Sequence, residues 1–228
     1  MTLYKVLDAG RYSCHGGYAQ WEPGAWQPPV RDLAMCKWGY HLLDRPRQVL
    51  QWLIPGGQLW EAEGRGEHLS EPDKSVWEEA RIVRQLHMPT RDELVALAAD
   101  MAERVLPLWE AVYPADGRPR QAIAAARQSA HGAPFTATAA AHAAAHAAAY
   151  AADAYAADAA DAAYAASAAA HAAYAATAHA RAATAAYAGA TAAAYAADAA
   201  YAASAAAHAA GPDELEWQDA LVLEVIRR

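Results

Sequence analysis

Four side chains near the start of the sequence carry the groups that zinc prefers, two thiols and two imidazoles. They are Cys14, His15, Cys36 and His41. Their spacing follows no Cys-x-x-Cys or His-x-x-x-His pattern, so we expect buried, reduced cysteines and no bound metal, with Cys14, Cys36 and His41 as the alternative metal ligands. Adjacent strand residues point to opposite faces, which separates the Cys14 thiol from the His15 imidazole. A Cys–His nucleophile would instead need His41 beside one of the two cysteines.

A second pair of imidazoles lies in an alanine-rich segment. His142 and His146 are four residues apart, and on a helix they share one face with Tyr150 and Asp153. Two histidines at this spacing can bind a metal ion, but no glutamate follows the first histidine as in the His-Glu-x-x-His motif of metalloproteases. We therefore expect a solvated helix face, with a metal site at His142 and His146 as the alternative, and no cofactor in the protein.

The composition excludes several classes of partner. Alanine contributes 69 of the 228 residues, and the formal net charge is -8 at pH 7. No segment carries the excess of basic residues that binding to phosphate groups needs, so we expect no nucleic-acid partner. Polar residues interrupt each alanine run well short of the width of a bilayer, and the first residues, MTLYKVLDAGRYSC, lack the apolar core of a signal peptide. These features predict a soluble, cytoplasmic protein without a membrane partner.

The thiols and imidazoles near the start must be positioned by a small domain over residues 1–88, which is rich in turns. Residues 3–6 and 59–63 have the polarity pattern of strands, and a short helix is expected after Asp44. Residues 75–86 fit a strand or a helix, and we favour a strand. Five tryptophans could form a binding platform, but a domain this small needs them for its core, which we favour. These are Trp21, Trp26, Trp38, Trp52 and Trp60.

Helices are predicted to dominate the sequence after residue 88. Thr90 and Glu93 have the spacing of a capping box, in which each side chain bonds the other residue's backbone N–H group at the start of a helix. Apolar residues then recur every three or four positions, and Pro107 should kink or divide this helix. A turn leads to a second helix that begins at Pro119, so residues 90–131 are predicted to form a helical hairpin.

An alanine-rich array follows at residues 135–210 and contains an internal repeat. Residues 161–173 and 198–210 both read DAAYAASAAAHAA, which indicates duplication of a unit. Alanine has the highest helix propensity, so we expect several packed helices in the array. A capping helix over residues 212–228 should close its open end.

The helical part of the chain resembles a known family. The run ELVALAADMAERVLPLWEAVYPADGRPRQAIAAAR at residues 93–127, the alanine array, and the closing ELEWQ at residues 214–218 are similar to the alanine-rich predicted immunity proteins of bacterial polymorphic toxin systems. This resemblance covers about residues 90–228 of the chain. It implies a cytoplasmic protein that binds and blocks a toxin, and it implies no catalytic residue.

The first 88 residues carry a second resemblance. The segments YKVLDAGRYSCHGG, CKWGYHLL and LWEAEGRGE are similar to an uncharacterised domain common in phage and bacterial proteins, where it often precedes a repeat region. The same segments resemble ADP-ribosyltransferases, which bind NAD. The resemblance to these enzymes implies that His15 holds the ribose, that Tyr40 stacks on nicotinamide, and that Glu63 or Glu67 orients the nucleophile.

These observations predict an α+β fold, with a small β-rich domain at residues 1–88 and an all-α, alanine-rich domain at residues 89–228. The leading interpretation is a non-enzymatic binding protein of immunity type whose partner is another protein, with a toxin as the specific candidate. The alternatives are an NAD-binding domain that uses His15, Tyr40 and Glu63, and a structural or phage-associated spacer.

Overall fold

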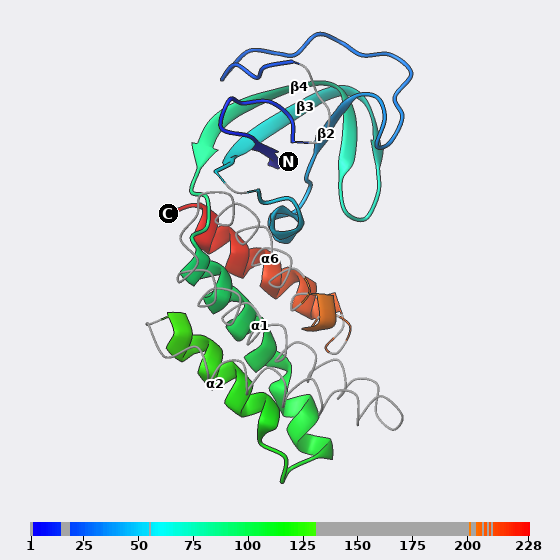
Figure 1. The fold of residues 1–228 in the computed structure, drawn as a ribbon. Helices are drawn as coiled ribbons and strands as arrows, with labels where there is room; N and C mark the ends of the chain where they lie inside the picture. Colours follow the sequence, from blue (N-terminus) through cyan, green and yellow to red (C-terminus); the bar gives the residue numbers. More distant parts are fainter. Residues whose placement is uncertain are drawn as a thin grey trace. The chain divides into compact units, whose positions relative to one another are not determined.

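The computed structural model describes residues 2–14, 19–54, 56–130, 201, 204–206, 208, 210 and 212–228. These residues form a mixed α+β structure, with a four-stranded antiparallel sheet and several helices (Figure 1). The chain divides into two compact units, Met1–Met88 with Leu223–Arg228, and Pro89–Val222. Most of the predicted array at residues 135–210 lies outside the described residues, and its few described positions are helical.

The sheet of the first unit has the strand order β1-β3-β4-β2. Its strands are β1 (Leu3–Leu7), β2 (Tyr40–Leu42), β3 (Gln58–Ser70) and β4 (Ser75–Leu86). Each neighbouring pair is antiparallel, with Leu3 of β1 opposite Ala62 of β3. A 3-10 helix, η1 (Pro46–Gln51), follows β2. It lies where the sequence predicts a short helix after Asp44.

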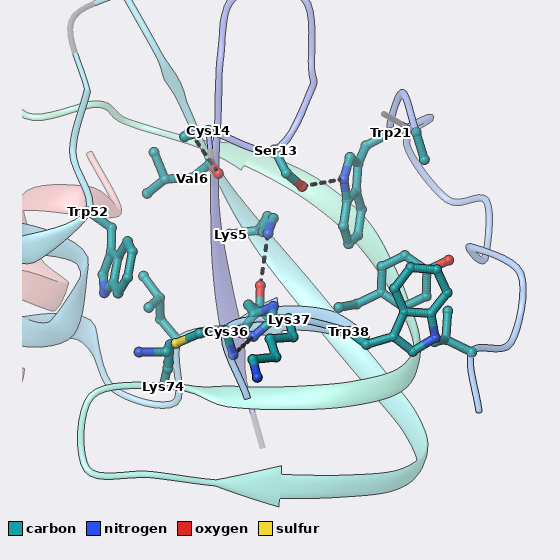
Figure 2. A pocket seen from close by; sticks show the side chains of 16 residues that line it. Lys5, Val6, Ser13, Cys14, Trp21, Cys36, Lys37, Trp38, Trp52 and Lys74 are labelled. Atoms are coloured by element: carbon teal, nitrogen blue, oxygen red, sulfur yellow. Dashed lines mark hydrogen bonds between the residues drawn. The ribbon is translucent and has the colours of Figure 1, made fainter. Parts of the chain in front are cut away.

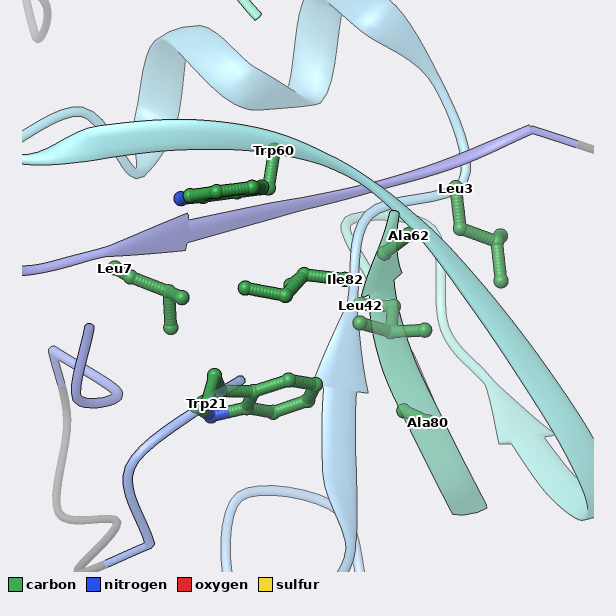
Figure 3. Close-up of a cluster of buried hydrophobic side chains, with 8 residues drawn as sticks. All are labelled: Leu3, Leu7, Trp21, Leu42, Trp60, Ala62, Ala80 and Ile82. Carbon is green, nitrogen blue, oxygen red and sulfur yellow. The ribbon is translucent and has the colours of Figure 1, made fainter. Parts of the chain in front are cut away.

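Buried apolar side chains of the strands and of the loop before β2 form the core of this unit (Figure 3). The cluster consists of Leu3, Leu7, Trp21, Leu42, Trp60, Ala62, Ala80 and Ile82. Trp21 meets Tyr40 edge to face, with ring centroids 5.6 Å apart. The expected core role holds for Trp21 and Trp60, which are 2% and 7% exposed, whereas Trp38 is 59% exposed. Trp38 is therefore an aromatic side chain that the core does not use.

Strand β3 is longer than the sequence pattern predicts. The predicted strand ends at residue 63, because Gly64 and Gly66 fit a turn, but β3 continues and forms a long hairpin with β4. Gly64 packs under the indole of Trp77, where an added β-carbon would lie 2.5 Å from Cε3 and closer still to Cδ2. Gly66 has a φ of +82° beside a register shift of the hairpin, as in a β-bulge. These glycines shape the strand without ending it.

Gly64→Ala is expected to lower the free energy of unfolding by about 2 kcal/mol, because the added methyl group overlaps the Trp77 indole. That indole is held in place, since it stacks on His68 with ring centroids 4.2 Å apart and donates from Nε1 to Ser75 Oγ at 2.7 Å. Urea denaturation measures the loss. In a Trp77→Val background the same substitution should cost less than about 0.5 kcal/mol. Equal costs in both backgrounds would contradict the overlap as the cause.

The second unit contains the predicted helical hairpin. Helix α1 (Arg91–Val112) begins at the expected capping box, where Glu93 N–H donates to Thr90 Oγ1 at 3.3 Å and Thr90 N–H donates to Glu93 Oε2 at 2.8 Å. The helix is not divided at Pro107, which lies on its exposed side. Its buried residues follow the predicted apolar spacing, except that Leu108 is half-buried and Val112, at the end of the helix, is 48% exposed. The buried residues are Leu94, Val95, Leu97, Ala98, Ala99, Met101, Ala102, Val105, Leu106 and Trp109.

Helix α2 (Arg118–Ala130) completes the hairpin and is tied to α1 by charge. The guanidinium of Arg127 pairs with Asp100 at 2.7 Å and with Glu103 at 2.5 Å. All three side chains are about 40% to 50% exposed, so solvent screens these ion pairs. The apolar contact of the two helices, with Ala122, Ile123 and Ala126 buried, contributes more to their association.

Helix α6 (Pro212–Ile226) contains a buried carboxylate that contacts α1. Glu214 is 1% exposed in its side chain and accepts a hydrogen bond from Arg104 Nε at 2.7 Å. The same guanidinium lies over the ring of Trp217, 4.7 Å from its centroid. Gln218 Nε2 donates to the second carboxylate oxygen of Glu214 at 3.1 Å. Burial of a carboxylate requires such partners.

The last residues of α6 belong to the first unit. Val225 and Ile226 are buried, and His87 N–H donates to the carbonyl oxygen of Ile226 at 3.1 Å. The first unit is therefore assembled from two segments that are far apart in the sequence.

Candidate functional site

A cavity of about 590 Å³ lies in the first unit (Figure 2). Its wall is formed by β1, β2, the loop between them, and residues near η1 and the start of β4. The lining contains three lysines, Lys5, Lys37 and Lys74, and four aromatic residues, Trp21, Trp38, Tyr40 and Trp52. No aspartate or glutamate is among the 16 lining residues. A volume of this size suits a small molecule or a few side chains of a partner.

Lys5 is the buried cation of the cavity. Its residue is 8% exposed, its Nζ donates to the carbonyl oxygen of His41 at 2.9 Å, and it lies 5.2 Å from the centroid of the Trp21 ring. Burial lowers the pKa of Lys5 from 10.5 to about 8, and the neighbouring Cys14 acts weakly in the opposite direction. Lys5 is therefore largely protonated at pH 7, without the usual stability of a solvated ammonium.

Cys14 lies in the same cavity and is half-buried, and Cys36 is exposed, so the expected burial of both cysteines is wrong. Its Sγ donates to the carbonyl oxygen of Val6 at 3.5 Å. Burial raises the pKa of the Cys14 thiol, Lys5 lowers it, and Asp8 raises it. Because the thiolate is the reactive form of cysteine, this environment suits an inert thiol better than a nucleophile.

His41 and Cys36 are joined through the backbone. The Cys36 N–H group donates to His41 Nε2 at 2.8 Å, and Cys36 has a φ of +60° in the left-handed region. Burial lowers the pKa of His41, and the charges of Lys5 and Lys74 lower it further. A neutral imidazole whose Nε2 already accepts a hydrogen bond is poorly placed to take a proton from a thiol. Its role in the cavity is to fix the loop that carries Cys36.

Lys74 is a buried cation that has a counter-ion. Its Nζ lies 2.7 Å from Asp73 Oδ2 and 5.2 Å from the centroid of the Trp52 ring. The hydrogen bond to Asp73 raises the pKa of Lys74, burial opposes this, and contact with Cys36 adds a smaller increase. Lys74 therefore has a carboxylate partner, whereas the Lys5 ammonium donates to a carbonyl oxygen only, among the described residues.

The residues implied by the resemblance to ADP-ribosyltransferases are not brought to one place by the described structure. Tyr40 lines the cavity, and its hydroxyl donates to the carbonyl oxygen of Pro28 at 2.8 Å. Glu63 pairs with Arg81 at 2.5 Å, and neither Glu63 nor Glu67 lines the cavity. His15 lies outside the described residues.

The described positions contain no group of three or more His, Cys, Asp or Glu residues that could hold a metal ion. Cys14, Cys36 and His41 share the cavity but do not form such a group. The alternative metal ligands His142 and His146 lie outside the described residues. Within the part of the chain that the structure describes, no helix is both long and apolar enough to cross a bilayer.

Three lysines line this cavity, and none of them is among the site residues predicted from the sequence. Lys5 stands between Tyr4 and Val6 in an apolar strand, and its neighbours at i−2 and i+2, Leu3 and Leu7, are both core residues. Because side chains alternate along a strand, this pattern places Lys5 on a buried face. This pattern in the sequence identifies Lys5 as an unusual residue.

Comparison of the chain with protein-family models, with curated proteins and with solved structures finds no match. The resemblances stated above therefore stay predictions.

Proposed function

We propose that this protein is a non-enzymatic, cytoplasmic binding protein of immunity type, which neutralises a toxin by direct contact. In this proposal the first unit contributes the cavity and Trp38 to the interface. The helical, alanine-rich array contributes a second surface. The proposal rests on the sequence resemblance of residues 90–228 and on the chemistry of the cavity.

The exposure of Trp38 is the observation that carries the proposal. Trp38 lines the cavity and is 59% exposed, whereas Trp21 in the same lining is buried, and Tyr40 and Trp52 are half-buried. Tryptophan and tyrosine beside a concave surface are enriched among the residues that dominate protein–protein affinity. An exposed tryptophan at the wall of a cavity is thus a suitable anchor for a partner.

The state of the polar groups in the cavity favours binding over catalysis. The Cys14 thiol is bonded to a carbonyl oxygen, and His41 Nε2 is bonded to a backbone N–H group. An acid, a base and a nucleophile converging on one point are the usual sign of an active site, and these bonds occupy the groups that would supply them. The NAD-binding alternative receives no support from Glu63, because that carboxylate pairs with Arg81 outside the cavity.

Affinity capture with the full chain tests the proposal. Wild-type protein, Trp38→Ser and the matched control Leu69→Ser are immobilised and exposed to lysate of the source organism. Leu69 is 46% exposed and lies on β3 outside the cavity lining. We expect one stoichiometric partner that is retained by wild type and by Leu69→Ser. Binding to Trp38→Ser should be at least about tenfold weaker.

A partner identified in this way is then produced in a host with and without this protein. Protection by the wild type and not by Trp38→Ser would support the immunity type. The lack of a stoichiometric partner, or equal capture by all three chains, would contradict the proposal.

A further inference from the structure

The cavity contains one positive charge that the described residues do not neutralise. Lys5 is 8% exposed and lines the cavity, and its Nζ donates to the His41 carbonyl oxygen. No carboxylate pairs with it in the described part of the chain, and none is among the lining residues. An ammonium group has three donors, and a buried charge without a counter-ion is costly. The site therefore favours an anion beside Lys5.

The other two lysines restrict the charge of that anion. Lys74 already pairs with Asp73 at 2.7 Å, and Lys37 is exposed. One unbalanced buried ammonium matches a single negative charge, as on a carboxylate. A group with two or three charges would need cations in addition to Lys5.

The side chains around Lys5 restrict the rest of the ligand to which the anionic group is attached. In Figure 2 the ammonium of Lys5 lies in the middle of the lining residues, with Trp52 on one side and Trp21 on the other. The Trp21 ring centroid lies 5.2 Å from Lys5 Nζ, and the Trp52 ring centroid lies at the same distance from Lys74 Nζ. Indole rings offer large, flat apolar surfaces for stacking. The body of the ligand should therefore be planar and apolar.

We infer that this cavity binds an aromatic carboxylate, with the carboxylate group on Lys5 and the ring among the tryptophans. A free aromatic acid and the carboxyl-terminal aromatic residue of a protein present the same chemistry. The inference does not require the partner proposed above, since an aromatic acid can bind whether or not a protein is captured.

Titration calorimetry with the full chain at pH 7 tests this ligand class. The probes are indole-3-acetate, its neutral amide indole-3-acetamide, and the peptide Gly-Gly-Trp with a free or an amidated carboxyl terminus. At least one acid should bind about tenfold more tightly than its amide, as expected for a charge-assisted hydrogen bond. The acid that binds best identifies the source, a small molecule or a chain terminus. Equal affinities of each acid and its amide, or no binding of any probe, would overturn the inference.

Two substitutions test whether the preference for the acid depends on Lys5 itself or on the total positive charge of the cavity. Lys5→Met should remove the preference for acid over amide, whereas Lys37→Met, which removes an exposed lysine of the same wall, should keep it. Binding of the amide by Lys5→Met shows that this variant is folded. A preference that survives in Lys5→Met would overturn the role of Lys5.

The pH dependence gives a second test that needs no substitution. The pKa of Lys5 is about 8, so the affinity for the acid should fall about tenfold from pH 7 to pH 9, while that for the amide stays constant. Among the other titratable groups near Lys5, burial raises the pKa of the Cys14 thiol and lowers that of His41, and the hydrogen bond to Asp73 raises the pKa of Lys74. An acid affinity that is constant from pH 7 to pH 9 would overturn the inference.

Discussion

Replacing Lys5 by methionine is expected to raise the free energy of unfolding at pH 7 by about 2 kcal/mol. Burial lowers the pKa of this ammonium from 10.5 to about 8, which corresponds to a cost of about 3 kcal/mol for keeping the charge in the folded protein. Methionine has a similar length and no charge. Removing the charge therefore stabilises the folded state, but the loss of the hydrogen bond to the His41 carbonyl oxygen offsets about 1 kcal/mol of this stabilisation.

The sign of the pH dependence follows from the same shift. Below pH 8 Lys5 is protonated in both the folded and the unfolded chain, so the full cost of burial is present. Between pH 8 and pH 10.5 the folded protein loses this proton while the unfolded chain keeps it. The unfolded state then binds more protons, and stability rises with pH. Wild type should gain stability in this window, and Lys5→Met should lack that gain.

Urea denaturation at pH 7, 8, 9 and 10, followed by tryptophan fluorescence, measures both effects. Lys37→Met is the matched control, because it removes an exposed lysine of the same cavity, and it should leave the pH profile of wild type unchanged. Parallel pH profiles of wild type and Lys5→Met would contradict the buried, unbalanced charge.

Arg104→Met is expected to lower the free energy of unfolding by about 3 kcal/mol, the largest loss among the substitutions considered. Glu214 is 1% exposed, and its carboxylate accepts a hydrogen bond from Arg104 Nε at 2.7 Å. Removal of the guanidinium leaves this carboxylate with the amide of Gln218 as its described partner, and a buried charge deprived of its counter-ion is strongly unfavourable. The stacking of Arg104 on Trp217 is lost as well.

Two further variants identify the cause of the stability loss in Arg104→Met. Arg120→Met removes an exposed guanidinium from the same unit, where it pairs with Glu110 with side-chain exposures of 61% and 35%, and it should cost less than about 0.5 kcal/mol. Arg104→Met combined with Glu214→Leu should recover most of the lost stability, because no buried charge then remains. Thermal and urea denaturation of the four chains provide the comparison. A double variant as unstable as Arg104→Met would contradict this account.

Local signals in the sequence are sufficient for much of the fold. The capping box of Thr90 and Glu93 predicts the start of α1 to the residue, and the apolar spacing predicts its buried face. Strand β3 is predicted too short, because the effect of Gly64 depends on Trp77 across the hairpin. Strand β2, with three residues, is too short to give a pattern. Local rules cannot predict contacts that form only after strands pair.

In the candidate site, too, the sequence predicts which residues take part but not the contacts that decide their roles. The chemistry of thiols and imidazoles points to Cys14, Cys36 and His41, and the resemblance to ADP-ribosyltransferases points to Tyr40; all four line the cavity. Their hydrogen bonds, however, give them different roles from those that their residue types suggest. Lys5 was missed because a lone lysine in a strand usually faces solvent. The core residues Leu3 and Leu7 on either side indicate a buried face, but the loop residues that complete the cavity around Lys5 are distant in the sequence.

The contacts of Arg104 also bear on the resemblance to immunity proteins. Arg104 lies in the AERVLPLWE segment, and Glu214 and Trp217 lie in the ELEWQ segment. The structure joins these segments by an ion pair and by stacking of the guanidinium on the indole. Packing between α1 and α6 therefore accounts for Arg104, Glu214 and Trp217 in these motifs. Any surface that contacts a toxin must be sought in other residues of the chain.

The two-segment construction of the first unit has a consequence during synthesis. Strands β1 to β4 leave the ribosome well before Leu223–Arg228, which complete the same unit. At translation rates of about 5 to 20 residues per second, the intervening segment Pro89–Val222 delays completion by roughly 7 to 27 seconds. During that time the backbone N–H group of His87 lacks its Ile226 partner, and the side chains of Val225 and Ile226, which are buried in the finished protein, are not yet in place. The nascent chain thus offers chaperones and proteases a site that the finished protein has closed.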